Sequence, residues 1–164
     1  MEYKLDSKPW LTDEAIQFLD QFLKETPKIV LELGSGGSTI WFAERAYHLI
    51  SFEHDIRWYE FVLSNLDKTK NVDYKLFKGS YFEEIETLPD NYFDLVLIDG
   101  KDRLECIKNS LTKIKSGGIL MLDDAQRARY QIVNNWLKNW QFFRTRQYDD
   151  QRQEVFETNW WIKF

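Results

Sequence analysis

The sequence predicts an α/β protein, a doubly wound and mainly parallel seven-stranded sheet that ends in an antiparallel hairpin. Short apolar runs rich in β-branched residues alternate with helical stripes along most of the chain. A glycine-rich turn joins the first run to the helix that follows it. At the C-terminus, two extended segments follow each other with no helix between them.

The chain has 164 residues, of which 43% are apolar and 30% are charged, and this gives room for one ordinary domain. We expect a single domain over residues 1–164, with an N-terminal helical extension (1–26) and a core (28–164). In the extension, Thr12 is placed to cap a helix. One apolar stripe marks this helix, formed by Ala15, Ile16, Leu19, Phe22 and Leu23.

The core is expected to alternate strands with helices. Its strands are the apolar runs at residues 28–33, 48–53, 72–79, 93–99, 117–124, 141–148 and 155–164. Helical stripes follow four of them, at residues 39–46, at 55–66, from Leu104 to Ile114 and from Ile132 to Trp140. The third and fourth strands are joined by a short connection through Pro89.

The acidic composition limits the partners. A formal net charge of -5 and a pI of about 5.1 argue against nucleic acid and anionic membranes as partners. Five arginines lie in the last third of the chain. We interpret them as solvated, with an anion site as the alternative: Arg127, Arg129, Arg144, Arg146 and Arg152.

The sequence also carries an expectation about location. The first residues lack the apolar segment of a signal peptide, and no run approaches about 18 uninterrupted apolar residues. The single cysteine, Cys106, cannot form an internal disulfide. We therefore expect a cytoplasmic protein.

Acidic side chains stand at the ends of four of the first five predicted strands. They are Glu32, Glu53, Asp99, Asp123 and Asp124. Because the carboxyl ends of parallel strands meet at one edge of a sheet, these carboxylates are expected to lie along the edge where such folds bind ligands.

The glycine-rich turn after the first strand points to a nucleoside. Gly34, Gly36 and Gly37 leave backbone N–H groups open at the start of a helix. Glu53 lies 19 residues beyond Gly34, at the end of the adjacent strand, where a carboxylate accepts the hydroxyls of a ribose. The turn reads GSGGST and not the GxGxxG of dinucleotide sites. Glu32, next to it, suits a ligand that carries an ammonium group.

The segments IVLELGSGGSTIWFA, LISFEHDIRWYEFV, FDLVLIDG and GGILMLDD resemble the successive motifs of class I S-adenosylmethionine-dependent methyltransferases, which have a Rossmann-like fold. The order is the same over nearly the whole chain. The resemblance implies a transferase that uses S-adenosyl-L-methionine, in which a nucleophile attacks the sulfonium methyl group in line.

The resemblance also implies roles for particular residues. Glu32, Gly34 and Gly36 would surround the methionine part of the cofactor, and Glu53 would hold the ribose. The other expected cofactor-binding residues are Ser35, Ser38, His54, Ser80, Tyr81 and Asp99. Ser38 replaces a frequent glycine of the family and is expected to cap the helix.

Two routes to deprotonation of the acceptor stay open. Asp99, Asp123 and Asp124 resemble, in position, the metal ligands of catechol-type O-methyltransferases, and oxygen ligands suit Mg²⁺. In the second route a general base acts without a metal, with Asp99, Asp124 and Lys101 as the candidates. Asp99 and Lys101 are the residues that we place first as catalytic.

The expected function is O-methylation of a hydroxyl on a small molecule or a glycan. Little chain is added around the predicted core, so the acceptor site is expected to be open or to be completed by a second subunit in a homo-oligomer. Trp10, Tyr81 and Tyr130 are candidates to stack on the acceptor. The alternatives are an NAD-dependent oxidoreductase and a non-catalytic module that keeps the cofactor pocket.

Overall fold

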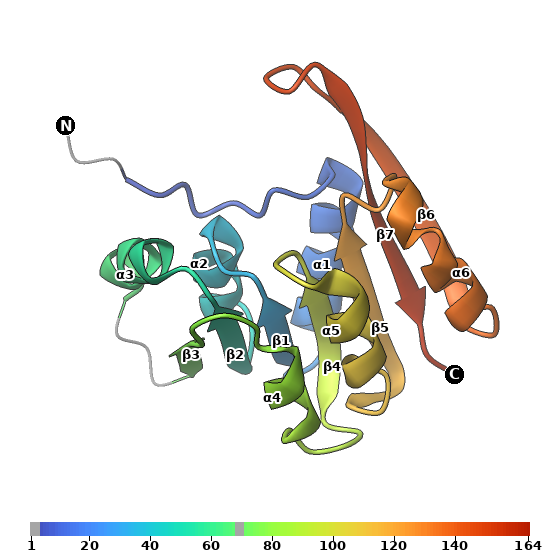
Figure 1. Cartoon of the computed structure of the whole chain (residues 1–164), viewed down its shortest axis with the longest axis horizontal. Coiled ribbons are helices and arrows are strands. Elements are labelled where there is room, and N and C mark those ends of the chain that lie inside the picture. Colours follow the sequence, from blue (N-terminus) through green and yellow to red (C-terminus); the bar gives the residue numbers. More distant parts are fainter. Residues whose placement is uncertain (1–3, 68–70) are drawn as a thin grey trace.

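The computed structural model describes residues 4–67 and 71–164. Its centre is a seven-stranded sheet in the order β3-β2-β1-β4-β5-β7-β6 (Figure 1). The parallel strands are β1 (Ile29–Leu33), β2 (His48–Glu53), β3 (Val72–Leu76), β4 (Phe93–Ile98) and β5 (Ile114–Asp123). β7 (Glu154–Ile162) runs antiparallel to both β5 and β6 (Gln141–Asp149). The predicted doubly wound sheet with a C-terminal hairpin is confirmed.

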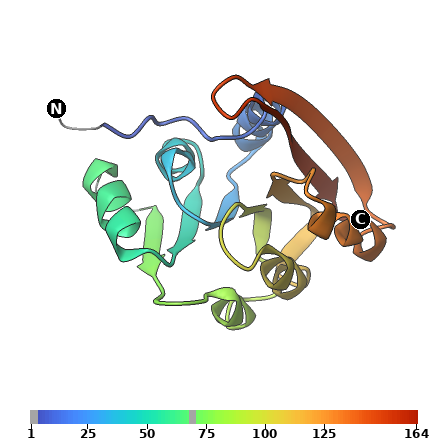
Figure 2. The same cartoon turned by 45° about the horizontal axis from the view of Figure 1, so that its top comes forward.

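Helices cover both faces of this sheet (Figures 1 and 2). One face is covered by α1 (Asp13–Glu25) and α2 (Gly37–Ala43). The other is covered by α4 (Phe82–Glu86), α5 (Arg103–Ser110) and α6 (Ile132–Trp136). α3 (Ile56–Asn65) packs beside α2, β2 and β3, and a 3₁₀ turn, η1 (Ala128–Tyr130), precedes α6.

The alternation of side chains along β4 shows why its residues 95–98 are all apolar. Leu95 and Leu97 belong to the core under α1 and α2, whereas Val96 and Ile98 belong to the core under α4, α5 and α6. Since successive side chains of a strand point to opposite faces, a stretch covered on both sides favours apolar side chains at every position.

The first helix after the glycine turn begins earlier than the sequence predicts. The prediction placed it at residues 39–46, but α2 begins at Gly37 and Gly36 is its N-cap residue. The expectation that Ser38 caps the helix is therefore wrong. Ser38 lies inside the first turn, and its hydroxyl donates to the Glu32 carboxylate. The buried Glu32 carboxylate thus binds the Ser38 hydroxyl, which was expected to cap the helix.

Other boundaries also differ, and the helix predicted from Ile132 to Trp140 ends at Trp136. The helix predicted from Leu104 to Ile114 ends at Ser110, and Ile114 begins β5 by pairing with Phe93 across a register shift. A buried isoleucine in helical register is indistinguishable by periodicity from the first residue of a strand. The connection through Pro89 contains α4, which is too short to show a clear stripe.

Two segments extend beyond the core of the sheet (Figure 1). The chain before α1 crosses the edge where the parallel strands end, and its Asp6 and Lys8 carbonyls lie against Gly37. The β6–β7 hairpin forms the edge of the sheet opposite β3, and its turn extends past the neighbouring strands. Thr12 caps α1 as predicted, since its hydroxyl accepts a hydrogen bond from the Ala15 N–H. Within the described residues, no helix is long and apolar enough to cross a lipid bilayer.

Candidate functional site

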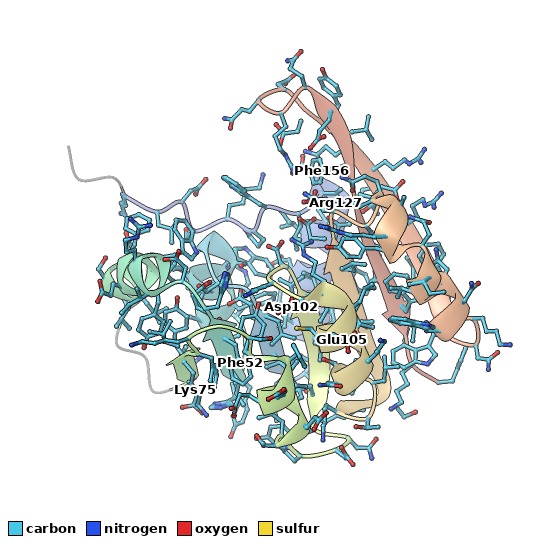
Figure 3. All side chains as sticks on the ribbon, in the orientation of Figure 1. Phe52, Lys75, Asp102, Glu105, Arg127 and Phe156 are labelled. Atoms are coloured by element: carbon cyan, nitrogen blue, oxygen red, sulfur yellow. The ribbon has the colours of Figure 1, made fainter. Side chains whose placement is uncertain are left out.

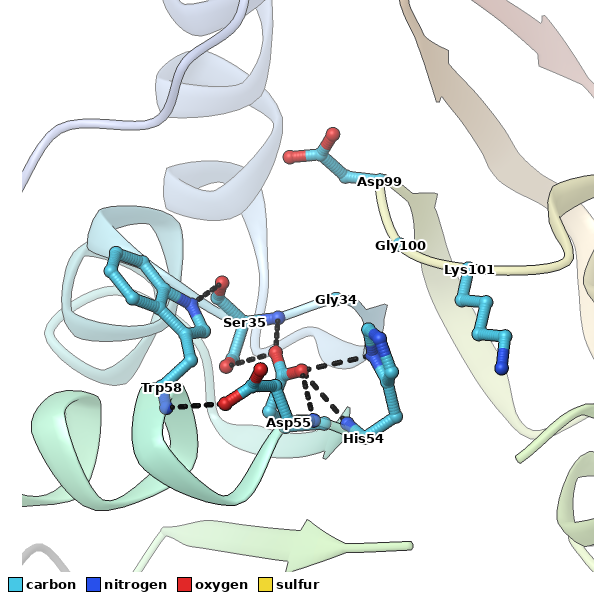
Figure 4. Close-up of a pocket in the computed structure, with 9 residues that line it drawn as sticks. Gly34, Ser35, His54, Asp55, Trp58, Asp99, Gly100 and Lys101 are labelled. Atoms are coloured by element: carbon cyan, nitrogen blue, oxygen red, sulfur yellow. Dashed lines mark hydrogen bonds and ion pairs between the residues drawn. The ribbon is translucent and has the colours of Figure 1, made fainter. Parts of the chain in front are cut away.

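A pocket of about 430 Å³ lies at the carboxyl ends of β1, β2 and β4 (Figure 4). Its wall contains six of the residues that the sequence predicts for the site: Gly34, Ser35, Glu53, His54, Asp99 and Lys101. These residues come from three different strand ends, and the parallel pairing of β1 with β2 and β4 brings them together.

Glu53, at the end of β2, has a carboxylate that is only 3% exposed and heavily hydrogen-bonded. One oxygen accepts from the backbone N–H groups of His54 and Asp55 at 2.8 and 3.0 Å. The other accepts from the N–H and the hydroxyl of Ser35 at 3.1 and 2.7 Å. The glycine-rich turn is therefore attached directly to the acid at the end of the neighbouring strand.

His54 borders the same carboxylate. Its Nδ1 lies 3.1 Å from a Glu53 oxygen, yet this buried nitrogen has no hydrogen-bond partner in the described chain. The His54 side chain as a whole is 38% exposed and lines the pocket, so a ligand can contact its ring.

Glu32 does not line the pocket. It is fully buried, and its carboxylate accepts hydrogen bonds from three hydroxyls, those of Ser38, Thr39 and Ser51. Burial raises the pKa of Glu32 to about 7, against the opposing effect of these hydroxyl donors. The structure thus places Glu32 beneath the turn, where it ties the start of α2 to β1 and β2.

Gly34 allows two strand-end loops to touch. Its φ of +98° belongs to the left-handed region, and a Cβ there would lie 2.6 Å from the backbone of Gly100. The sequence assigned this glycine to a bare turn that faces a ligand. The structure adds a packing reason, because the turn after β1 presses against the loop after β4.

Asp99 and Lys101 stand on that second loop, but their side chains diverge. Figure 4 shows the Asp99 carboxyl group and the Lys101 ammonium group on opposite sides of the loop. Burial, followed by the charge of Asp123, raises the pKa of Asp99 well above its ordinary value. Asp99 therefore holds a proton more readily than an ordinary aspartate.

A guanidinium that the sequence reasoning missed lies among the strand-end acids. Arg103 donates to the backbone carbonyls of Asp99, Gly100 and Asp123 at 3.2, 3.0 and 2.6 Å. It also lies 3.3 Å from an Asp99 carboxylate oxygen. One cationic side chain thus joins the ends of β4 and β5. The sequence signal that could have revealed this contact is an arginine, Arg103, at the start of the helix that follows the strand-end Asp99.

Asp123 and Asp124 are already engaged. Asp123 accepts a hydrogen bond from the Thr158 hydroxyl at 2.9 Å, and burial raises its pKa to about 6. Asp124 forms ion pairs with Arg127 at 2.8 Å and Arg152 at 3.2 Å. Burial would raise the pKa of Asp124, but the two guanidiniums outweigh it and hold the pKa below its usual range.

The predicted metal ligands are therefore not gathered as a set. In the described part of the chain, no group of three or more His, Cys, Asp or Glu side chains has an arrangement that could hold a metal ion. Asp124 points to arginines and Asp123 to a threonine, each on chain that comes later in the sequence. Sequence spacing alone does not reveal these partners.

Three other predicted residues lie outside the pocket wall. Gly36 donates its N–H to the Thr39 hydroxyl and serves as the N-cap of α2. Ser80 is exposed, and its hydroxyl donates to Asp102 at 2.9 Å. Tyr81 is buried, and its hydroxyl accepts the Lys101 N–H at 3.1 Å, so it supports the loop after β4 from below.

The pocket also uses residues that were not predicted. Trp58 lies on its wall, with its indole N–H donating to the Ser35 carbonyl at 2.8 Å (Figure 4). Asp55 and Gly100 complete the wall. Trp58 falls outside the apolar stripe predicted for its helix, and a large aromatic residue off that stripe was the signal to notice.

Residues 31–125 match the methyltransferase-domain family. The chain belongs to this family. The resemblance to class I S-adenosylmethionine-dependent methyltransferases seen in the sequence is thereby confirmed, and the order of the sheet agrees with it. Comparison with curated protein sequences gives no match.

Solved structures share the fold of this methyltransferase. An O-methyltransferase from Bacillus cereus in complex with SAH has a TM-score of 0.73 at 17% identity, over 92% of this chain and 80% of that one. The O-methyltransferase TomG from Streptomyces achromogenes, in complex with SAM, has a TM-score of 0.74 at 16% identity, over 92% and 79%. The tRNA methyltransferase TrmI from Aquifex aeolicus has a TM-score of 0.70 at 16% identity, over 98% and 72%. At these identities the likeness establishes the fold.

Proposed function

We propose that this methyltransferase transfers the methyl group of S-adenosylmethionine to a hydroxyl oxygen of a small molecule or a glycan. The pocket at the ends of β1, β2 and β4 carries the proposal, because its volume suits a small ligand and its wall contains Glu53. When bound, the cofactor supplies a methyl group on a positively charged sulfur, which an oriented nucleophile attacks in line. The family match and the structures solved with SAM or SAH support this cofactor.

The polar groups of the pocket fit an adenosine. In our proposal, Glu53 accepts the ribose hydroxyls after the Ser35 hydroxyl, now 2.7 Å away, gives up its place. The imidazole of His54 and the indole of Trp58, both on the pocket wall, then flank the nucleoside. His54 and Trp58 follow Glu53 within five residues, so a single segment of the chain would contact both the ribose and the rest of the nucleoside.

Glu32 has an indirect role in this proposal. Since three hydroxyls occupy its carboxylate and it is fully buried, it does not contact the methionine ammonium group in the present arrangement. It fixes Ser38 and Thr39 at the start of α2 and so holds the backbone of the glycine turn in place. The backbone of Gly34 and Ser35 is what the turn offers to the cofactor.

Asp99 is the residue that we propose as general base. It lines the pocket, its side chain is partly accessible, and its raised pKa makes its carboxylate a stronger proton acceptor than that of an ordinary aspartate. Lys101 follows on the same loop but points away from Asp99, which favours a role in binding the acceptor over one as the base.

The base route finds more support than a Mg²⁺ route through Asp99, Asp123 and Asp124. Mg²⁺ needs carboxylate oxygens that converge on one point, whereas Asp124 is held by two arginines and Arg103 already lies between Asp99 and the end of β5. Methyl transfer is therefore expected to be unchanged by about 5 mM EDTA, which is an excess over trace metal. Loss of activity that added Mg²⁺ restores would reinstate the metal route.

Calorimetry tests the cofactor directly. We expect S-adenosylhomocysteine to bind with a Kd in the range of about 1 μM to 1 mM, typical of enzyme substrates, and NADH to give no binding heat. Heat with NADH and none with S-adenosylhomocysteine would favour a dinucleotide-dependent oxidoreductase. Cofactor binding without methyl transfer to any hydroxyl of an untargeted acceptor library would favour a non-catalytic module.

A further inference from the structure

A second pocket of about 480 Å³ adjoins the proposed cofactor site. The two pockets share Gly100 and Lys101, so the loop after β4 forms part of both walls. The rest of the second wall comes from the start of α5 and from the segment that follows β5. An acceptor in this second pocket would contact the Lys101 side of this loop, whereas the Asp99 side chain lines the first pocket.

The second pocket is rich in cations. Four basic side chains line it, Lys101, Arg103, Arg127 and Arg129, against two acids, Asp102 and Glu105. Figure 3 labels Asp102 and Glu105 near α5 and Arg127 on the chain after β5. This local excess of positive charge contrasts with the formal net charge of -5 of the whole chain.

Two of the four cations are used by the protein itself. Arg103 is bound to the backbone carbonyls at the ends of β4 and β5. Arg127 is paired with Asp124. Lys101 and Arg129 differ from these two, because neither side chain has a carboxylate partner among residues 4–67 and 71–164.

Among the described residues, neither acid on the wall forms an ion pair with Lys101 or Arg129. Glu105 pairs with Lys108 at 2.9 Å, and Asp102 accepts the Ser80 hydroxyl at 2.9 Å. Both acids are thus turned toward partners outside the pocket wall. The pocket is left with Lys101 and Arg129 as donors for an incoming anion.

Arg129 is also held in place. Its guanidinium lies 4.9 Å from the centre of the Tyr130 ring, and Tyr130 is buried in the core beneath α6. A guanidinium resting on a fixed ring loses less freedom when it binds an anion than a free side chain does. Leu104 and Tyr130 give the same pocket an apolar part.

We infer that this second pocket binds the methyl acceptor and that the acceptor is a small molecule with an anionic group, a carboxylate or a phosphate, held by Lys101 and Arg129. This inference rests on the proposed function. A small acceptor fits better than a polyanion, because the net negative charge of the chain repels long phosphate backbones.

Direct binding measurements test this inference. The protein, saturated with S-adenosylhomocysteine, is titrated with benzoate, phenyl phosphate and their neutral analogue benzyl alcohol, and binding is followed by ligand-detected NMR. At least one anion is expected to bind about 10-fold more tightly than benzyl alcohol, as the loss of one charge-assisted hydrogen bond implies. The stronger of the two anions identifies the group as carboxylate or phosphate.

Variants assign the preference to the pocket. The double change Arg129→Gln and Lys101→Met should abolish the preference for an anion, and Arg129→Gln alone should reduce it. The matched control is Lys138→Met, an exposed cation outside both pocket walls, which should keep the preference. Equal binding of benzyl alcohol, or a preference that survives the double change, would overturn the inference. So would displacement of phenyl phosphate by micromolar polyuridylate, which would indicate a polyanion site.

The same titrations separate this inference from the proposed function. They are repeated without S-adenosylhomocysteine, and the affinity for that compound is measured in every variant. A wild-type protein that binds the anions but not S-adenosylhomocysteine would contradict the cofactor assignment and retain the anion site. A protein that binds S-adenosylhomocysteine but shows no anion preference would contradict only the acceptor site.

Discussion

At the scale of single residues, Glu53 and Glu32 show how two acids at neighbouring strand ends take different roles. Glu53 lines the pocket and accepts hydrogen bonds from the chain around it. Glu32 is enclosed by hydroxyls and lies outside the pocket wall. The difference follows from their positions, since Glu53 ends β2 whereas Glu32 is still followed by a buried residue of β1.

Replacing Glu53 with glutamine tests its contact with the ribose. We expect Glu53→Gln to weaken the binding of S-adenosylhomocysteine by about 1–3 kcal/mol, because a charged acceptor of ligand hydroxyls is lost. Calorimetry measures the change, and circular dichroism checks that the variant is folded. Ser35→Ala is the control: it removes the hydroxyl that the ribose would displace, so it should not weaken binding. An affinity unchanged in Glu53→Gln would argue against the ribose assignment.

Replacing Glu32 with glutamine tests the buried charge. Its folded pKa of about 7 exceeds the ordinary value of 4.5, so the folded protein keeps a proton that the unfolded chain releases between these pH values. The stability from this proton is present below pH 4.5 and is lost as the pH rises to about 7, an effect of roughly 2–4 kcal/mol. Asp123, whose pKa is also raised, contributes with the same sign.

Glu32→Gln should therefore flatten the pH dependence of the free energy of unfolding between pH 5 and pH 8 and leave the contribution of Asp123. Urea unfolding followed by tryptophan fluorescence measures this at several pH values. If the variant and the wild type show the same slope, the Glu32 carboxyl is already ionised at pH 5 and its cage of hydroxyls outweighs burial.

At the scale of elements, the site depends on contact between two strand-end loops. The loop after β1 carries Gly34 and Ser35, and the loop after β4 carries Asp99 and Gly100. Tyr81 supports the second loop from the core, and its hydroxyl would lie 1.9 Å from a Cβ at Gly100. Neither loop has room for an added side chain where the two meet.

Adding one methyl group at this contact should be costly. Gly34→Ala combines a left-handed φ with a Cβ that would lie only 2.6 Å from the Gly100 backbone. We expect it to destabilise the protein by about 2–4 kcal/mol. Gly79→Ala is the matched control, since Gly79 has the same φ of +98° but nothing within 4 Å of the added atom. The control should cost only about 1–2 kcal/mol. Equal losses in urea unfolding would show that the loops separate easily.

At the scale of the whole molecule, the parallel pairing of β3, β2, β1, β4 and β5 puts all strand-end groups on one edge. The proposed cofactor pocket is therefore made of segments far apart in the sequence. A ligand bound there contacts three strand ends at once, so it stabilises the folded chain as a unit.

Cofactor binding should accordingly raise the melting temperature. S-adenosylhomocysteine at 100 times its Kd is expected to stabilise the folded protein by about 2.7 kcal/mol. For a domain of this size that corresponds to a rise in Tm of roughly 5–10 °C. Differential scanning fluorimetry measures the shift, with NADH at the same concentration as the control. A larger shift with NADH would oppose the methyltransferase assignment.

Much of this architecture could be predicted from the sequence because it depends on local patterns. The apolar runs of β1, β2 and β4 show no polar alternation, which is what burial on both faces requires. Gly34, Ser35, Glu53 and Asp99 were placed at the pocket because strand ends and glycine turns can be recognised within a few residues.

The sequence by itself determined the sheet, the glycine turn and the acids at its edge, since each depends on neighbours along the chain. Only the tertiary structure decided that Glu32 lies beneath the turn, that Arg103 lies between the strand-end acids, and that Asp124 is paired with Arg152. These contacts join residues up to 28 positions apart. The charge and pKa of each acid depend on which side chains meet it in space, and periodicity carries no information about that.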